Sequence, residues 1–177
     1  MVIWMTGLSG AGKTTLAYEL EQKILLKGIN VMVLDGDILR NGINSNLGFS
    51  EEDRFENIRR AAEIAKLFLQ KNFICICSFI TPLESMRQLA KNIVGSKNYI
   101  EVFIDCSLDT CEKRDVKGLY KKVRLNQIDN FTGISSNFEN PVNPNFVINT
   151  EKNGIKESVD LLLKQLELIK ENKYKLF

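Results

Sequence analysis

The chain of 177 residues contains no histidine, three prolines and one tryptophan. Without histidine there is no imidazole base and no Ser-His or Cys-His nucleophile pair, so proton transfer falls to a carboxylate, a lysine or a tyrosine. The four cysteines have no CxxC spacing, and with no histidine beside them they do not form a zinc-binding pattern. We therefore expect free, buried thiols and no zinc.

The sequence also has little net charge and no long apolar run. Lysine and arginine number 24 against 22 acidic residues, a formal charge of +2 that is too small for general attraction to nucleic acid or anionic lipid. The longest apolar stretch, residues 73–80, is far too short to cross a bilayer, and no basic segment precedes the apolar N-terminus. We expect a cytoplasmic protein with no nucleic-acid or membrane partner.

Apolar runs rich in Val, Ile and Phe alternate with stretches of helical period. This pattern predicts an α/β fold in which helices cover both faces of a parallel sheet. Five strands are predicted at residues 2–6, 30–34, 73–78, 99–105 and 145–149. Helices are expected at 13–26, from a Ser50 cap onward, from Thr81-Pro82 to near Gly95, and at 154–170. Residues 1–177 would form one domain.

Two segments rich in glycine, asparagine and serine, residues 36–48 and 126–145, interrupt this alternation. Loops of that length in an α/β domain are usually lids or binding loops, and surface disorder is the alternative.

The strongest motif is a phosphate-binding loop, GxxxxGK[ST], between the first predicted strand and helix. Its residues are Gly7, Leu8, Ser9, Gly10, Ala11, Gly12, Lys13 and Thr14, followed by Thr15. Such a loop turns backbone N–H groups and a helix N-terminus toward the phosphates of ATP, while the lysine supplies positive charge and the Thr14 hydroxyl ligates Mg²⁺. The glycine spacing differs from the GxGxxG of dinucleotide-binding folds.

An acidic pair follows the second predicted strand, at Asp35 and Asp37. The carboxyl ends of parallel strands face one crevice, so this pair should lie beside the phosphate loop. Two carboxylates repel one another unless a cation or hydroxyl donor is near, which favours a role beside Mg²⁺ and an acceptor hydroxyl. A solvated turn is the alternative.

Together these motifs and several others resemble the adenylylsulfate kinase (APS kinase) family over residues 3–150. The matching segments are 7–14, Asp35-Gly36-Asp37 with Arg40, Leu47-Gly48-Phe49-Ser50, Asp53-Arg54 with Asn57-Ile58-Arg59-Arg60, Ser78-Phe79-Ile80, Arg114-Asp115 with residues 117–122, and Phe131-Thr132-Gly133-Ile134. The resemblance implies a P-loop fold of the nucleoside-monophosphate-kinase type, usually dimeric. It also implies that the γ-phosphate of ATP is transferred to the 3′-hydroxyl of adenosine 5′-phosphosulfate (APS), a small nucleotide acceptor, giving PAPS.

The resemblance also implies roles for individual residues. Asp37 corresponds to the acid that orients and deprotonates the 3′-hydroxyl, and Asp35, Lys13 and Lys117 are the further catalytic candidates, with Lys117 meeting developing charge. Arg114 belongs to a lid over ATP, which we place at about 111–140. The acceptor's anionic groups would be held by Arg40, Arg54 and Asn57, and its base would lie between Phe49 and Phe131, although either phenylalanine could instead belong to the core.

The sequence departs from the family pattern near the expected acceptor pocket. Ile38 and Asn46 replace an asparagine and an aspartate, Thr81 replaces a serine proposed to carry a phosphoryl group, and Leu83 replaces an aromatic residue or histidine. Ile80 and Thr81 are therefore also site candidates. Two alternatives stay open: the same 3′-phosphorylation of cytidine diphosphoramidate in capsule biosynthesis, and a nucleotide-binding regulatory module without turnover.

Overall fold

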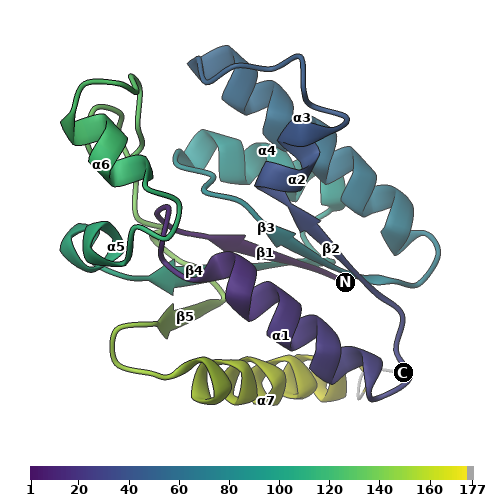
Figure 1. Ribbon diagram of the computed structural model, residues 1–177. Helices are drawn as coiled ribbons and strands as arrows, with labels where there is room; N and C mark the ends of the chain where they lie inside the picture. The colour runs from purple at the N-terminus through teal and green to yellow at the C-terminus, as the bar shows by residue number, and fades with distance from the viewer. Residues whose placement is uncertain (175–177) are drawn as a thin grey trace.

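A five-stranded parallel sheet forms the centre of the protein (Figure 1). The computed structural model describes residues 1–174, with side chains up to residue 167. The strands are β1 (Val2–Thr6), β2 (Val31–Asp35), β3 (Ile74–Ser78), β4 (Tyr99–Asp105) and β5 (Phe146–Asn149). They lie in the order β2-β3-β1-β4-β5, and every neighbouring pair is parallel. The predicted sheet is confirmed, with strand ends within one residue of those expected.

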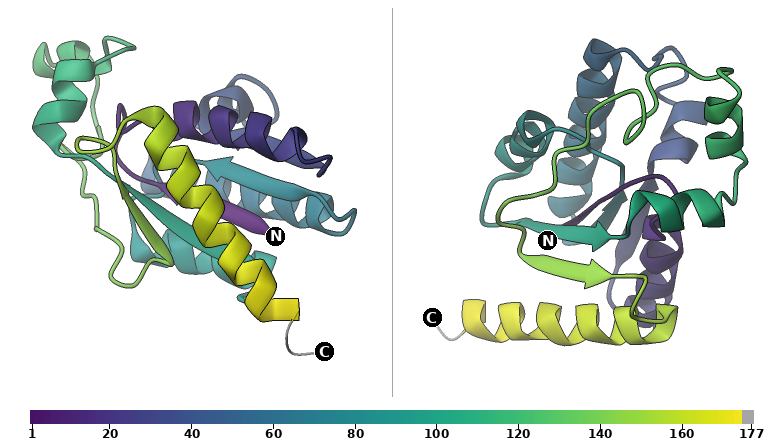
Figure 2. Two further views of the ribbon diagram at one scale, coloured as in Figure 1. Left: turned by 90° about the horizontal axis from the view of Figure 1, so that it is seen from below. Right: turned by 90° about the vertical axis from the view of Figure 1, so that its left-hand side faces the viewer.

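Helices cover both faces of the sheet (Figures 1 and 2). One face carries α1 (Lys13–Leu25) and α7 (Ile155–Tyr174), and the other carries α3 (Glu51–Leu69) and α4 (Glu84–Val94). The short helices α2 (Gly36–Asn41), α5 (Leu108–Arg114) and α6 (Leu119–Arg124) follow strands β2 and β4. The predicted three-layer α/β architecture is therefore confirmed.

The two helical layers are separated by the alternation of side chains along the strands. In the fully buried strand β1, Ile3 and Met5 pack with α1 and α7, whereas Val2 and Trp4 pack with α3 and α4. Cys75 and Cys77 of β3 join the second cluster, and all four cysteines are free and buried, as expected. A strand buried on both faces needs an unbroken apolar run, which is the pattern visible in the sequence.

Local signals explain the start of α3 and the end of α4. The Ser50 hydroxyl accepts a hydrogen bond from Asp53 N at 3.1 Å, so the predicted cap of α3 is confirmed. Three acidic residues follow in its first turn, where they favour the positive end of the helix dipole. Gly95 ends α4, also as predicted.

Two expectations were wrong. Residues 36–41, expected within a loop, form helix α2, because the Asp35 side chain accepts hydrogen bonds from Asp37 N and Ile38 N and so caps it. Helix α4 begins at Glu84 and not at Thr81-Pro82, because Thr81 has a left-handed backbone (φ 44°). The Glu139 carboxylate instead accepts a hydrogen bond from Glu84 N at 2.7 Å.

The loops that hold the predicted site residues meet at the carboxyl edge of the sheet. Strands β1, β2, β3 and β4 end there at Thr6, Asp35, Ser78 and Asp105. Helices α5 and α6, with the segment after them, lie at the same edge (Figure 1). Within residues 1–174, no helix combines the length and apolar character needed to cross a membrane.

Candidate active site

The phosphate loop runs from β1 into α1 and depends on its glycines. Gly7 has φ 152°, and a Cβ atom there would lie 2.5 Å from the Ile104 carbonyl oxygen of β4. Gly12, with φ 99°, is the left-handed residue directly before Lys13, the first residue of α1. Any side chain at Gly7 would push the loop away from β4, so the sequence pattern and the backbone agree.

Lys13 is folded onto the loop that carries it. Its ammonium group donates to Gly7 O at 2.9 Å and Leu8 O at 2.7 Å, and the residue is 8% exposed. Burial lowers the pKa of Lys13 to about 8. A phosphate bound in the loop would favour the charged form of this lysine, so its environment suits an anion.

Thr14, Asp35 and Ser78 form a polar group beside the loop. The Thr14 hydroxyl donates to Asp35 Oδ2 at 2.8 Å and lies 3.3 Å from Ser78 Oγ. Asp35 and Ser78 are register partners on β2 and β3. These hydroxyl and carboxylate oxygens are hard donors of the kind Mg²⁺ prefers. Among the described residues no set of three or more His, Cys, Asp or Glu could hold a metal, so an ion here would need ligands from phosphate or water.

The structure brings Asp37 and Lys117 together from positions 80 residues apart. The Lys117 ammonium contacts the Asp37 carboxylate as an ion pair, with both side chains more than half exposed. Asp37 lies in the first turn of α2, and Lys117 lies in the turn between α5 and α6. The segment that the sequence predicts to be a lid therefore reaches the acidic pair.

Two arginines surround Phe49. The Arg40 guanidinium carbon lies 4.4 Å from the centroid of the Phe49 ring, and Arg40 donates to Gly48 O at 2.7 Å. Arg54 donates to Phe49 O at 3.0 Å and also contacts Asn130 O and the Thr132 hydroxyl of the 126–145 segment. Burial lowers the pKa of both arginines, and for Arg40 the nearby charge of Arg54 adds to this.

The aromatic and amide candidates differ in exposure. Phe49 is 62% exposed, so it is not a core residue. Phe131 is half-buried and packs against the cluster that includes Tyr120. Asn57 is buried one turn from Arg54, and its side-chain oxygen accepts a hydrogen bond from Asn44 at 2.9 Å. The structure therefore buries Asn57 against Asn44, where it supports the 42–48 segment.

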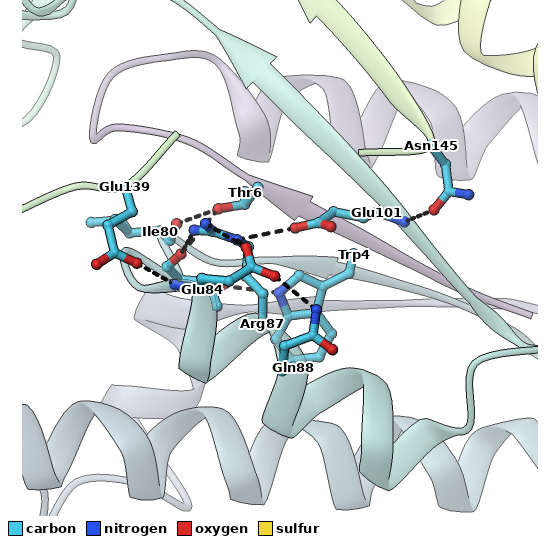
Figure 3. Close-up of polar contacts among 10 residues, drawn as sticks. Trp4, Thr6, Ile80, Glu84, Arg87, Gln88, Glu101, Glu139 and Asn145 are labelled. Carbon is cyan, nitrogen blue, oxygen red and sulfur yellow. Dashed lines mark hydrogen bonds and ion pairs between the residues drawn. The ribbon is translucent and has the colours of Figure 1, made fainter. Parts of the chain in front are cut away.

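In the turn after β3, Ile80 contacts the start of the phosphate loop, whereas the Thr81 side chain lies in the core (Figure 3). Ile80 O accepts hydrogen bonds from the Thr6 hydroxyl at 2.6 Å and from Gly7 N at 3.3 Å, so the turn supports the start of the phosphate loop. The Thr81 side chain points the other way: it is 1% exposed, and its hydroxyl accepts from Trp4 Nε1 at 2.9 Å.

Sequence reasoning missed a buried arginine that supports this turn. Arg87 of α4 is 1% exposed, donates to Thr81 O at 3.0 Å and pairs with Glu84 at 2.9 Å (Figure 3). Glu101 of β4 lies 3.2 Å from Arg87 Nε as a second ion partner. The Glu84–Arg87 spacing is visible in the sequence, but it is equally typical of an exposed pair. The sequence also predicts no role for Ser78, because strand order is needed to place it beside Asp35.

Arg114 ends α5 next to the phosphate loop. It donates to Thr150 O at 2.7 Å and to the Thr150 hydroxyl at 3.2 Å, and that hydroxyl in turn donates to Ala11 O at 2.8 Å. Thr15 is exposed on α1 directly after Thr14. The candidates for an ATP site thus lie on or next to the phosphate loop, and Asp37 and Arg40 lie on α2, directly after β2.

Comparison with known proteins identifies the family of this chain. The adenylylsulphate kinase family profile matches residues 1–149. The adenylyl-sulfate kinase of Bacteroides thetaiotaomicron is 51% identical over 166 residues, which cover 94% of this chain and 83% of that protein. The APS kinase of Mycobacterium tuberculosis, solved with AMPPNP and APS, has a TM-score of 0.91 and 42% identity, covering 94% of this chain and 96% of that one. A hexameric APS kinase from Thiobacillus denitrificans has a TM-score of 0.71 and 29% identity, covering 94% of this chain and 28% of that one. This chain belongs to the adenylylsulphate kinase family.

Proposed function

We propose that the protein transfers the γ-phosphate of ATP to the ribose 3′-hydroxyl of adenosine 5′-phosphosulfate. The observation that carries this is the arrangement of two half-sites at one edge of the sheet. The phosphate loop with Lys13 and Thr14 lies on one side, and Asp37 with two arginines lies on the other. Relatives that are about 50% identical over most of this chain are adenylyl-sulfate kinases.

The chain's own residues account for each part of the reaction. The loop amides and Lys13 bind the phosphates of ATP. Asp37 accepts the proton of the 3′-hydroxyl while that oxygen bonds to the γ-phosphorus and the bond to ADP breaks. Mg²⁺, when bound beside the Thr14 hydroxyl, supplies charge neutralisation on the phosphates.

The acceptor half-site suits a nucleotide with two anionic groups. Arg40 and Arg54 donate hydrogen bonds to neutral carbonyl and hydroxyl oxygens. Neither guanidinium donates a hydrogen bond to a carboxylate among the described residues, so both can donate to phosphate and sulfate. The exposed Phe49 ring offers a face for the base, with Phe131 as the second aromatic candidate.

An ADP-release assay tests this function and its alternatives. The assay compares APS, cytidine diphosphoramidate and a reaction without acceptor. We expect ADP release that depends on APS. The kcat/KM for the cytidine compound should be at least ~10-fold lower, because losing one or more hydrogen bonds to the edge of the base weakens transition-state binding by about that factor. A preference for the cytidine compound would show that APS is not the acceptor, while the proposed 3′-phosphorylation would still hold. ATP binding without ADP release for any acceptor would indicate the regulatory module.

The family resemblance suggests further properties of the working enzyme. We expect residues 1–177 to act as one kinase domain with a lid at about 111–140, dependent on Mg²⁺, dimeric and cytoplasmic. Because one relative is hexameric, sedimentation equilibrium should be used to measure whether this protein is a dimer or a larger assembly. Activity in Mg²⁺ that is lost on chelation and restored on addition tests the metal.

A further inference from the structure

Tyr120 of α6 joins the two half-sites of the proposed kinase. It is 1% exposed, and its hydroxyl donates to the Ser9 carbonyl oxygen of the phosphate loop at 2.8 Å. Its ring meets the Phe131 ring edge to face, with the centroids 4.9 Å apart and the planes at 74°. One side chain thus touches both the loop proposed for ATP and an aromatic residue proposed for the acceptor.

The contact with Ser9 fixes more than a carbonyl group. A peptide bond is planar and trans, so the C=O of Ser9 and the N–H of Gly10 point in opposite directions. Gly10 has φ 78°, a left-handed conformation that glycine adopts without steric strain. A hydrogen bond that holds Ser9 O on Tyr120 therefore turns the Gly10 N–H to the other side of the loop. Phosphate loops bind their anion through backbone amides of this kind.

Tyr120 is itself held rigidly. The Asp115 carboxylate accepts hydrogen bonds from Tyr120 N and Lys121 N, both at 3.0 Å, which fixes the first turn of α6. The ring lies in the core cluster with Ala11 and Cys111. Burial raises the pKa of Tyr120, so the hydroxyl keeps its proton and stays a donor. A well-anchored donor can orient the loop without contact with either substrate.

We propose that Tyr120 is a positioning residue that orients the Gly10 amide for ATP through its hydroxyl and the Phe131 ring for the acceptor through its ring. The proposal rests on the proposed function. It predicts that the two contacts can be separated: deleting the hydroxyl affects ATP alone, and deleting the ring affects both substrates.

Two variants separate these contacts. Tyr120→Phe keeps the ring and removes the bond to Ser9 O; we expect kcat/KM for ATP to fall ~3- to 10-fold, with KM for APS within about 2-fold of wild type. Tyr120→Leu removes both contacts; we expect the same loss for ATP and, in addition, a ~3- to 10-fold rise in KM for APS. Isothermal titration with a non-hydrolysable ATP analogue measures the ATP arm without turnover, and Tyr120→Phe should weaken that binding by the same factor.

Tyr99→Phe is the matched control. Tyr99 is also a buried tyrosine, 4% exposed in the cluster opposite α1, and its hydroxyl has no hydrogen-bond partner among the described residues. This variant should leave both KM values and the analogue affinity unchanged. Melting temperatures of all variants show that each is folded at the assay temperature.

The outcomes distinguish the proposal from the function on which it rests. Wild-type protein that binds the analogue but phosphorylates no acceptor would contradict the proposed function, and the titration would still test the role of Tyr120 at the loop. An active wild type with unchanged ATP parameters in Tyr120→Phe would overturn the proposal. Equal changes for both substrates in Tyr120→Phe, or the same losses in Tyr99→Phe, would also overturn it, because they indicate a general loss of packing.

Discussion

Replacing Arg87 by methionine should destabilise the protein by about 3–5 kcal/mol. Methionine fills much of the space of the arginine stem, but it leaves the Glu101 carboxylate, 13% exposed, without its cation. Glu101 Oε1 is buried and receives no hydrogen bond from the described residues, since Arg87 Nε–H is directed at Glu84. Glu84 is 43% exposed and can be solvated, so it adds little to the cost.

Thermal and urea unfolding measure this loss. A chain of this size shifts its melting temperature by about 2–4 °C per kcal/mol, so we expect Arg87→Met to melt ~6–20 °C lower. Adding Glu101→Gln removes the uncompensated carboxylate and should restore roughly half of the loss or more. Arg59→Met is the control: Arg59 pairs with Glu56 on exposed α3 surface, where a salt bridge contributes at most ~1 kcal/mol.

The pH dependence tests the charge argument. Burial raises the pKa of Glu101, and Arg87 opposes that rise, so the pKa is higher still in Arg87→Met. The native state then binds more protons than the unfolded state above the ordinary glutamate pKa of 4.5. In Arg87→Met, protonated Glu101 therefore adds to the free energy of unfolding. This contribution is fully present below pH 4.5 and is lost as the pH rises through the pKa of Glu101 in the native state. The deficit of Arg87→Met should therefore shrink toward acid pH; a constant deficit, with no rescue by Glu101→Gln, would refute this reasoning.

Three further predictions concern the reaction itself. Lys13→Ala and Thr14→Ala should abolish turnover while the protein stays folded, because they remove the charge and the hydroxyl beside the phosphates; near-normal kcat would contradict the ATP site. Asp37→Asn should lower kcat by ~10²–10⁴ with little change in the affinity for an ATP analogue measured by calorimetry, and a larger effect for Asp35→Asn would reverse the two roles. Thr81→Ala should retain substantial activity, since the Thr81 hydroxyl is buried against Trp4; a phosphothreonine at this position, formed and discharged at the turnover rate, would show the opposite.

The sequence predicts those parts of the fold that depend on local pattern. The apolar runs place all five strands, and the Ser50 cap places the start of α3. The pattern fails where a distant residue decides the local structure. Thr81 followed by proline is typical of a helix start, but Trp4 and Arg87 hold Thr81 in a left-handed turn, and Glu139 supplies the cap instead.

The candidate site shows the same division. The phosphate loop is contiguous in sequence, so its residue spacing predicts its geometry. The contact between Asp37 and Lys117 joins positions 80 residues apart, and the Ser78 side chain reaches Thr14 because β3 lies beside β1. Family resemblance can bring such residues to attention, but strand order and lid placement are needed to show which of them touch.

The four departures from the family pattern lie in different surroundings. Thr81 faces the core, and Leu83 is half-buried against the cluster on the α3 and α4 side. The Asn46 side chain accepts a hydrogen bond from Arg60 at 2.8 Å, so it supports the loop through α3. Ile38 is 58% exposed on α2. Changes at Thr81 and Leu83 therefore affect packing, and the change at Asn46 affects the support of its loop.

We expect acceptor choice to depend in part on Arg40 and Arg54, which match the family, in addition to contacts at the base edge. Arg40 and Arg54 lie close enough for the charge of one to lower the pKa of the other, and both donate to neutral oxygens. Two adjacent cations repel one another, and although the charges of Asp53 and Asp37 offset part of that cost at Arg40, an anion bound beside both arginines would lower it further. An acceptor with phosphate and sulfate side by side relieves more of that cost than one whose second group is an uncharged amide. We therefore expect the charge of the site to favour the phosphosulfate over the phosphoramidate, whichever base the acceptor carries.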